Sequence, residues 1–269
     1  NNGGDALACA VELVARGYLP HVVMLGEPAT LPTDARSAWQ RLCELPTDAF
    51  TLQLGASSEI ADAEWIVDGL FGIGLKRALD GAFGDAVRVI SQARDAGAKV
   101  LALDAPSGID ADTGALVGDA VVAADFTLTF LSLKPGLLTG PALDFVGELH
   151  CDALGTVDGA SAHEAIAVNH AYIDAVLMPR AANAHKGSQG TCVIIGGADG
   201  MLGAATLASR SAMRCGAGKA KVGWLSSAAP ALDANMPEIM MASASDIVAS
   251  DATAMVIGCG LGVSGAAVR

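Results

Sequence analysis

The fold class is read most directly from residues 83–104, FGDAVRVISQARDAGAKVLALD. The first part of this stretch repeats apolar residues at the spacing of one helix face, and Gly97 suits the position just after a helix end. The second part, Lys99 to Leu103, is an apolar run of strand length that ends at Asp104. A helix followed at once by a buried strand is the repeating unit of a parallel sheet covered by helices.

The same alternation extends in both directions along the chain. In the first half we expect helices over 5–17 and 33–44, and strands over 21–25, 65–67 and 126–131. In the second half we expect strands over 191–195, 219–225 and 254–257, a glycine-rich loop over 196–203 and a helix over 204–215. The sequence therefore predicts an α/β protein whose ligands bind where the strands end.

Charge and cysteine content narrow the class of protein. Acidic residues (29) outnumber basic ones (16), for a formal net charge of −13, and such a surface disfavours nucleic acid, which needs clustered lysine and arginine. None of the six cysteines forms a Cys-x-x-Cys pair, so we expect buried free thiols in a reducing compartment. The longest uncharged run, Ala252–Val268, is broken by glycines and makes poor material for a membrane helix. With no signal peptide, we expect a cytoplasmic protein that binds no membrane.

Asn1-Asn2-Gly3-Gly4-Asp5 stands at the expected mouth of a helix. Glycines there let the backbone approach a ligand, and free N–H groups together with the helix dipole favour an anion such as phosphate. The competing interpretation is an ordinary capping turn with Asp5 as an acid in the first helical turn. Two adjacent amides exceed what capping needs, because one side chain suffices.

Two further polar clusters follow expected strands. Residues 67–76, VDGLFGIGLK, join the strand-end Asp68 to a glycine-rich loop whose Lys76 either meets a phosphate or is simply solvated. Residues 104–108, DAPSG, place an aspartate, a proline-fixed turn and a hydroxyl directly after a buried strand. Since neighbouring parallel strands end at one rim of a sheet, we expect Asp68 and Asp104 to share the rim where ligands bind.

Together these three motifs resemble the NAD(P)H-hydrate epimerase family, also called the YjeF N-terminal family, whose fold is Rossmann-like. Residues 134–147 are similar to that family as well. The chain departs from it at Ala6, where the family usually has glycine. The resemblance implies interconversion of the R and S forms of hydrated NADH and NADPH, with Asp104 as acid/base. It implies a K⁺ ion held by oxygens of Asn2, Asp68 and Ser107. The implied substrate-binding residues are Asn1, Asn2, Gly3, Gly4, Asp5, Gly72, Ile73, Gly74, Leu75, Lys76 and Asp104.

The second half carries its own glycine motifs, at residues 185–190, 196–205, 215–218 and 257–262. In this order they resemble the ADP-dependent NAD(P)H-hydrate dehydratase family, which has a ribokinase-like fold. The resemblance implies that Ala204, Gly260 and Gly262 touch the hydrated nucleotide. It also implies that the complete domain uses ADP and Mg²⁺ to phosphorylate the S hydrate. Taken singly, each glycine also fits a plain turn.

Two other functions stay open. A dinucleotide-binding oxidoreductase fits Gly197, Gly200 and Gly203, although Ser226 and Ser227 occupy the place where an acid for a ribose hydroxyl is expected. A catalytically inactive YjeF-type binding scaffold is the other, and retention of Asn2, Asp68, Asp104 and Ser107 together speaks against it.

The motifs also predict the organisation of the chain. We expect an epimerase domain over 1–160 without its first strand, a linker with one short strand over 161–184, and the first part of a dehydratase domain over 185–269. Such a chain is truncated at both ends, and we expect it to be unable to repair the S hydrate by itself, because the phosphoryl donor site would be missing. The sequence leaves a homo-oligomer open.

Overall fold

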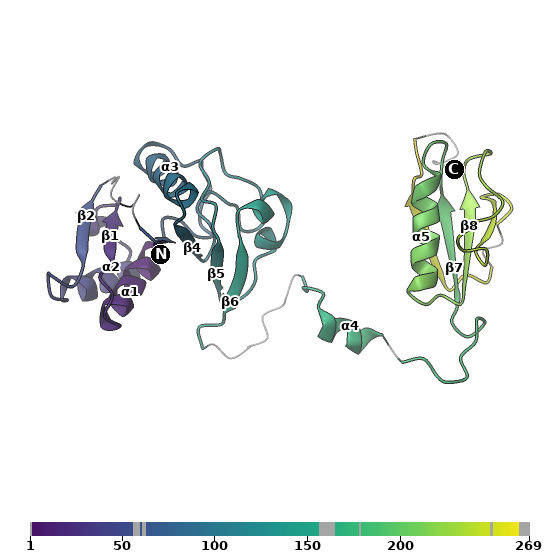
Figure 1. Ribbon diagram of the computed structural model, residues 1–269, viewed down its shortest axis with the longest axis horizontal. Helices are drawn as coiled ribbons and strands as arrows, with labels where there is room; N and C mark the ends of the chain where they lie inside the picture. Colours follow the sequence, from purple (N-terminus) through teal and green to yellow (C-terminus); the bar gives the residue numbers. More distant parts are fainter. Residues whose placement is uncertain are drawn as a thin grey trace. The chain divides into compact units, whose positions relative to one another are not determined.

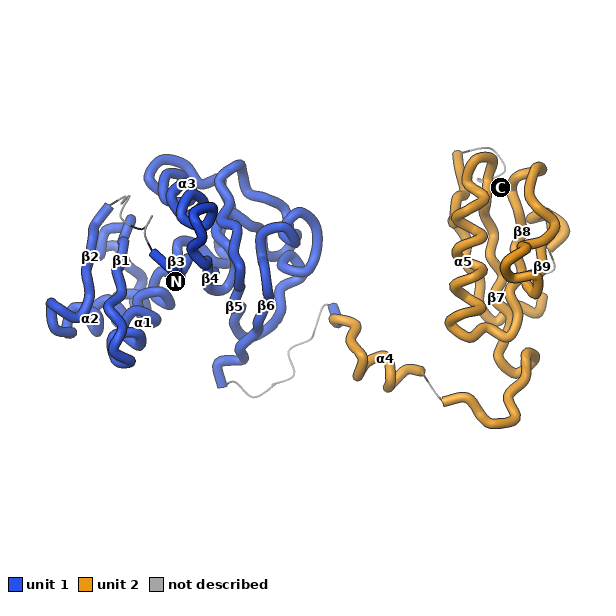
Figure 2. The backbone as a smooth tube through the Cα atoms, viewed as in Figure 1, with its two compact units in different colours: residues 1–166 blue, residues 167–269 orange. Residues whose placement is uncertain are grey.

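The computed structural model describes residues 2–55, 60, 63–155, 165–177, 179–247 and 250–263. The chain divides into two compact units, residues 1–166 (unit 1) and 167–269 (unit 2), coloured blue and orange in Figure 2. Within each unit, every pair of neighbouring named strands is parallel. The predicted α/β class with parallel sheets is therefore confirmed.

Unit 1 alternates helices and strands along the chain (Figure 1). Its elements are α1 Asn2–Ala15, β1 His21–Met24, η1 Pro28–Thr30, α2 Thr33–Cys43, β2 Thr51–Leu54, β3 Trp65–Asp68, α3 Gly81–Asp95, β4 Lys99–Leu103, β5 Phe126–Phe130, η3 Pro135–Leu138, η4 Gly140–Asp144 and β6 Glu148–Asp152. The strands form two separate sheets, the pair β1-β2 and the four-stranded sheet β3-β4-β5-β6. The carboxyl ends of β3, β4 and β5 therefore lie side by side.

Two of the apolar clusters of unit 1 pack its helices. The buried face of α3, which includes Val87, Ile90 and Ala93, packs with Val100 and Ala102 of β4. At the β1-β2 end of the unit, α1 packs on α2 through Leu7, Ala10, Ala38 and Leu42. Burial of such side chains contributes about 1.5–3 kcal/mol for each large one. The carboxyl ends of the strands, where the polar motifs lie, are therefore supported by a well-packed core.

Two of these strand ends turn through an unusual backbone conformation. Asp104, after β4, has φ 64° and Leu131, after β5, has φ 67°. Each is bridged by a hydrogen bond of three-residue turn type, from Ala105 N to Leu103 O and from Ser132 N to Phe130 O, both 2.8 Å. Such turns are uncommon for residues other than glycine and cost of order 1–3 kcal/mol. Strain of this kind accumulates at sites that must point a side chain in one direction.

Unit 2 is a smaller α/β layer. Its elements are α4 His170–Val176, β7 Thr191–Gly196, α5 Leu202–Arg214, β8 Lys219–Trp224, β9 Met240–Ser243 and β10 Ala254–Cys259. The strand order is β10-β7-β8-β9, and Figure 1 shows α5 beside β7 and β8. Their common core includes Ile194, Ala205, Val222 and Trp224.

Some sequence-based expectations are wrong in detail. Within 165–177 the expected linker strand is instead the helix α4, whose first turn is capped by Asn169 Oδ1 accepting from Tyr172 N at 2.9 Å; residues 161–164 and 178 lie outside the described part. All six cysteines are free, but Cys43, Cys151 and Cys215 are exposed rather than buried. Among the residues that the structure describes, no helix has the length and apolar character needed to cross a membrane.

Candidate active site

Asp68 and Ser107 form the buried centre of the site. Asp68 ends β3 and is 1% exposed, as is Ser107 in the loop after β4. The Ser107 backbone N–H and hydroxyl donate to the two carboxylate oxygens at 2.8 and 2.7 Å, and Leu70 N adds a third bond at 3.1 Å. Burial raises the pKa of Asp68 above its usual value, while these hydrogen bonds act in the opposite direction. No basic side chain pairs with Asp68 in the described part of the chain.

Asn2 lies against the loop that follows Asp68. Asn2 is 8% exposed, and neither the nitrogen nor the oxygen of its side-chain amide has a hydrogen-bond partner among the described residues. A Cβ placed on Gly72 would lie 3.4 Å from Asn2 Oδ1, and one on Gly69 would lie 3.3 Å from Asn2 O. A buried amide without partners is uncommon, because each unsatisfied group costs about 1–3 kcal/mol. This amide therefore calls for a ligand that supplies the missing contacts.

Asp104 occupies the neighbouring strand end. Its Oδ1 accepts a hydrogen bond from Lys134 Nζ at 2.9 Å, and the two side chains are only 16% and 15% exposed. Its Oδ2 faces the loop after β3: Ile73 N lies 3.5 Å away, and a Cβ on Gly72 would approach to 2.8 Å. The structure thus brings Asn2, Asp104 and the Gly72 backbone together at one place on the rim, next to the Asp68–Ser107 pair.

The predicted substrate loop divides into inward and outward residues. Ile73 is 53% exposed and a Cβ on Gly74 would meet nothing within 4 Å, so this part of the loop is open. Leu75, by contrast, is 4% exposed and belongs to the α3 core, so its side chain is not available to a ligand. Lys76 is exposed and lies 3.7 and 3.9 Å from the carboxylates of Asp112 and Asp110. Such exposed pairs contribute little and leave the lysine available.

The N-terminal motif is more helical than predicted. Helix α1 begins at Asn2 rather than residue 5, so Gly3, Gly4 and Asp5 form its first turn; Asn1 lies outside the described residues. A Cβ on Gly4 would lie 2.8 Å from Ala35 Cα, so this glycine permits close packing of α1 on α2. Gly3 has room for a ligand, with only Gly69 O near its Cβ position at 3.8 Å. The pKa of Asp5 is raised, mainly by partial burial and in part by the charge of Asp104.

In unit 2 the two glycine loops meet at the carboxyl ends of β7 and β10. Ala198 N donates to Gly260 O at 2.7 Å, and a Cβ on Gly260 would lie 3.2 Å from Ala204 Cβ. A Cβ on Gly262 would reach 3.1 Å from Ala198 Cβ. Ser226, at the end of β8, hydrogen-bonds Asp199 of the first loop. Ala204, Gly260 and Gly262, predicted to touch one nucleotide, therefore lie close together.

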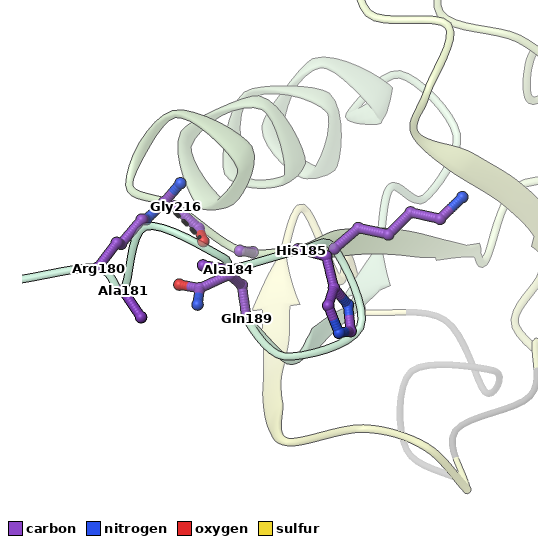
Figure 3. A pocket seen from close by; sticks show the side chains of 9 residues that line it. Arg180, Ala181, Ala184, His185, Gln189 and Gly216 are labelled. Carbon is purple, nitrogen blue, oxygen red and sulfur yellow. Dashed lines mark hydrogen bonds between the residues drawn. The ribbon is translucent and has the colours of Figure 1, made fainter.

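A separate hollow of about 350 Å³ lies at the other end of unit 2. Figure 3 shows Arg180, Ala184, His185 and Gln189 around this hollow, with Gly216 just after the end of α5. The backbone carbonyl of Gly216 accepts a hydrogen bond from Arg180 Nη2 at 2.8 Å. The hollow contains none of the predicted site residues. Among the described residues, no group of three or more His, Cys, Asp and Glu side chains could hold a metal, so a metal site in this part of the chain would combine at most two such side chains with amide, hydroxyl or backbone oxygens.

Lys134 is the residue at the site to which the sequence assigned no role. It follows β5 by four positions and precedes Pro135-Gly136, so the available signal was a lone lysine before a tight turn near a strand end. That signal does not reveal its partner, because the direction of the turn decides which strand end the ammonium reaches.

The chain is similar to known proteins over most of its length. Residues 192–268 match a family model described as NAD(P)H-hydrate dehydratase. A bifunctional NAD(P)H-hydrate repair enzyme of Leishmania major is 38% identical over 232 residues, covering 82% of this chain and 40% of that protein. One of Coxiella burnetii is 36% identical over 277 residues, covering 98% and 54%. An NAD(P)H-hydrate epimerase of Bordetella pertussis is 42% identical over 158 residues, covering 58% and 66%.

The chain spans about half the length of the bifunctional relatives that it matches. The family model described as YjeF-related protein N-terminus matches residues 1–136, just over half of the 269 residues. This match covers α1, β3, β4 and the loop after β4, and so includes Asn2, Asp68, Asp104 and Ser107. The chain therefore belongs to the family of YjeF-related protein N-termini.

Proposed function

We propose that unit 1 interconverts the R and S forms of hydrated NADH and NADPH. The observation that carries this proposal is the placement of the Asp104 carboxylate, which turns one oxygen toward an open glycine loop beside the buried amide of Asn2. The relatives named as epimerases and bifunctional repair enzymes supply the substrate class.

Asp104 is the proposed proton-transfer group. Exchange of the two forms requires the hydroxyl on the reacting ring carbon to leave as water and to return on the other face. A carboxyl group that protonates the leaving hydroxyl, and later takes the proton back from the entering water, performs both halves of this cycle. Oδ2 is the oxygen directed toward the loop, so we assign the transfer to it. The outward backbone of residues 72–74 then holds the dinucleotide.

The buried centre fits a K⁺ ion. Asp68 is a buried carboxylate without a basic partner in the described residues, and Asn2 offers an orphan amide oxygen near the same loop. Alkali cations prefer such oxygen donors, and a cation would offset the buried negative charge. We propose that Asn2, Asp68 and Ser107 hold the ion, which supplies positive charge for the substrate's polar groups.

For unit 2 we propose the beginning of an ADP-dependent dehydratase domain, with residues 185–269 in that domain, 161–184 as linker and 1–160 as the epimerase domain. The meeting of Ala204, Gly260 and Gly262 supports a nucleotide site at the ends of β7 and β10. In the complete protein, ADP and Mg²⁺ would serve the phosphorylation of the S hydrate.

Six free cysteines support a reducing compartment such as the cytoplasm.

The test measures epimerisation directly. The purified 269-residue chain is added to the separated R form of hydrated NADH in KCl, and the R to S ratio is followed by chromatography against a protein-free sample. We expect the chain to accelerate equilibration, and Asp104→Asn to lower the rate about 100-fold or more, as expected on loss of an acid/base group. Replacing K⁺ by choline should lower the rate as well.

The scaffold alternative makes the opposite prediction. Equal rates of R to S conversion with and without the chain, under conditions in which the chain binds the hydrate, would establish a binding module and remove the epimerase assignment. Full activity of Asp104→Asn would instead keep the activity and transfer the acid/base role to another residue.

A further inference from the structure

All three N–H donors of the Lys134 ammonium make hydrogen bonds within the protein. The ammonium donates to Asp104 Oδ1 at 2.9 Å, to Thr129 Oγ1 at 2.8 Å and to Phe130 O at 2.6 Å. A lysine ammonium has three N–H donors and no acceptor. Each of the three is therefore directed at one protein oxygen, and none is left for a substrate. Lys134 can act on a reaction only through the groups that it holds.

Two of its three acceptors are fixed by the sheet. Thr129 and Phe130 are the last residues of β5, and Thr129 is fully buried. Phe130 O is additionally held by Ser132 N across the turn at Leu131. The ammonium is thus anchored to the end of β5, and the third acceptor, on the end of β4, is the only one on a rotatable acidic side chain.

The backbone of Lys134 is fixed from the other side. Gly136 N donates to Ala111 O at 2.8 Å, and a Cβ on Gly136 would lie 2.5 Å from the Ala111 carbonyl. The turn after Lys134 is therefore packed directly on the loop after β4. Both ends of the lysine side chain are determined by parts of the fold that do not belong to the substrate loop.

This arrangement leaves the two oxygens of Asp104 in different situations. Oδ1 is taken by the Lys134 ammonium, whereas Oδ2 has one long contact, 3.5 Å from Ile73 N, in the described part of the chain. Tilting the carboxyl group out of this orientation would break its contact with a nearly buried ammonium, and charge-assisted bonds are the strongest of the hydrogen bonds. The ammonium consequently holds the carboxyl group with one oxygen toward Lys134 and the other toward the loop.

We infer that Lys134 is the positioning residue for the acid/base of the proposed epimerase: it holds one carboxylate oxygen of Asp104, so that the other, here Oδ2, faces the substrate and exchanges protons with it. This inference rests on the proposed function. Lys134 lowers the barrier by holding the carboxyl group in one orientation, and displacement of a catalytic group by about 1 Å lowers rates by roughly 100-fold.

The first experiment compares Lys134→Ala with Lys99→Met in the R-hydrate assay. Lys99 pairs with Asp125 at 3.4 Å, is 55% exposed and belongs to no part of the site, so its variant controls for loss of a lysine charge from unit 1. We expect Lys134→Ala to lower kcat about 100-fold with little change in KM, and Lys99→Met to leave both unchanged. Thr129→Val, which removes one anchor of the ammonium but no charge, should give an intermediate kcat.

Chemical rescue separates positioning from damage to the fold. Ethylammonium added to Lys134→Ala at saturating KCl should restore part of kcat, because a primary ammonium can donate to Asp104 Oδ1. Tetramethylammonium, which has the charge but no N–H donor, should restore nothing. The wild-type chain receives the same amines, which accounts for any effect of ammonium ions at the K⁺ site, and circular dichroism establishes that the variant is folded.

The outcomes distinguish this inference from the function on which it rests. An active wild-type chain with a kcat of Lys134→Ala within about threefold overturns the positioning role alone, since misplacement should cost far more. A fall in kcat that neither amine restores, with Thr129→Val fully active, also overturns it and makes Lys134 a stabilising residue. A wild-type chain without epimerase activity overturns the proposed function and this inference together.

Discussion

Asp104 is constrained at both its backbone and its side chain. Its N–H donates to Leu128 O at 2.7 Å and its φ is 64°, a conformation that asparagine and glycine tolerate far better than alanine. Replacement by alanine would therefore mix lost chemistry with added strain of about 1–2 kcal/mol. Asparagine keeps the backbone preference and the shape of the side chain, which makes Asp104→Asn the informative variant.

Gly72 offers a test of the same site by one added methyl group. Its Cβ would lie 2.8 Å from Asp104 Oδ2 and 3.4 Å from Asn2 Oδ1, so Gly72→Ala must displace one of these groups. We expect kcat/KM for epimerisation to fall about 10- to 100-fold, equivalent to about 1.4–2.7 kcal/mol, with little loss of thermal stability. Gly26→Ala, whose Cβ would meet nothing within 4 Å, is the matched control. Equal rates for the two variants would show that the carboxylate does not depend on this contact.

The sequence identified the chemistry-bearing residues more reliably than their partners. Asp68 and Ser107 were predicted to hold one ion together with Asn2, and the structure places these two in direct contact. The contacts of Lys134 could not be predicted, because they depend on the path of residues 131–134 in space. The burial of Leu75 could not be separated from its loop, since a loop motif does not reveal which side chain returns to the core. The ligand roles of all these residues stay predictions.

At the scale of elements, α5 is tied to the segment before β9 by one ion pair. Arg210 donates to both carboxylate oxygens of Asp233, through Nε at 2.6 Å and Nη2 at 2.7 Å. This bidentate bond lowers the pKa of Asp233 to about 2. Asp233 is 5% exposed and also accepts from Asn235 N at 2.9 Å, so it organises the turn as well as the pair.

The pair predicts how the stability of unit 2 depends on pH. A carboxyl group whose folded pKa is below its unfolded value of about 3.9 stabilises the fold above that value, and the effect disappears as pH falls toward 2. We expect the urea concentration at half unfolding of unit 2 to decrease as the pH is lowered from 5 to 2. Asp233→Asn should make this dependence on pH weaker. Trp224 is the single tryptophan of unit 2, so its fluorescence in a Trp39→Phe, Trp65→Phe background reports the transition. An unchanged slope in Asp233→Asn would contradict the prediction.

Elements with an apolar run or an apolar face in the sequence were predicted, whereas the exposed strands β2, β6 and β9 were not. Helix α3 and strand β4 follow from the repeat of Ile90 and Ala93 and from the run Lys99–Leu103. Strand β6, Glu148–Asp152, has four exposed residues of five, so it carries no apolar alternation and exists because β5 pairs with it. Strands β2 and β9 lack a signal for the same reason, and tertiary pairing decided them.

At the scale of the whole chain, the two units have separate cores, and we expect them to unfold separately. Gly197 tests this expectation: it has φ 67°, and its Cβ would lie 2.5 Å from the ring of Trp224. Gly197→Ala should lower the unfolding midpoint reported by Trp224 by the equivalent of more than about 1 kcal/mol, and leave the transition reported by Trp39 and Trp65 unchanged. A shift of both transitions would show that the units stabilise each other.

Strand β10 predicts self-association. It pairs with β7 at one edge of its sheet, and Met255, Val256 and Ile257 are 49%, 38% and 64% exposed. An apolar edge strand is a template for pairing with another chain. Sedimentation velocity should show concentration-dependent oligomers that Ile257→Lys reduces. Leu207→Lys, at a 66% exposed position on α5, is the control; oligomers equally sensitive to both changes would place the contact elsewhere.

The left-handed conformation of Asp104 has an evolutionary consequence. Backbone and proposed chemistry together restrict this position: the turn suits glycine best and strains asparagine and aspartate less than other side chains, and the proposed proton transfer accepts only aspartate among them. A lineage that abandons catalysis while keeping the fold therefore has a short list of substitutions, headed by asparagine and glycine. Descendants that persist as binding modules should carry asparagine or glycine at the position of Asp104. The residue at this position should therefore distinguish active enzymes from inactive relatives.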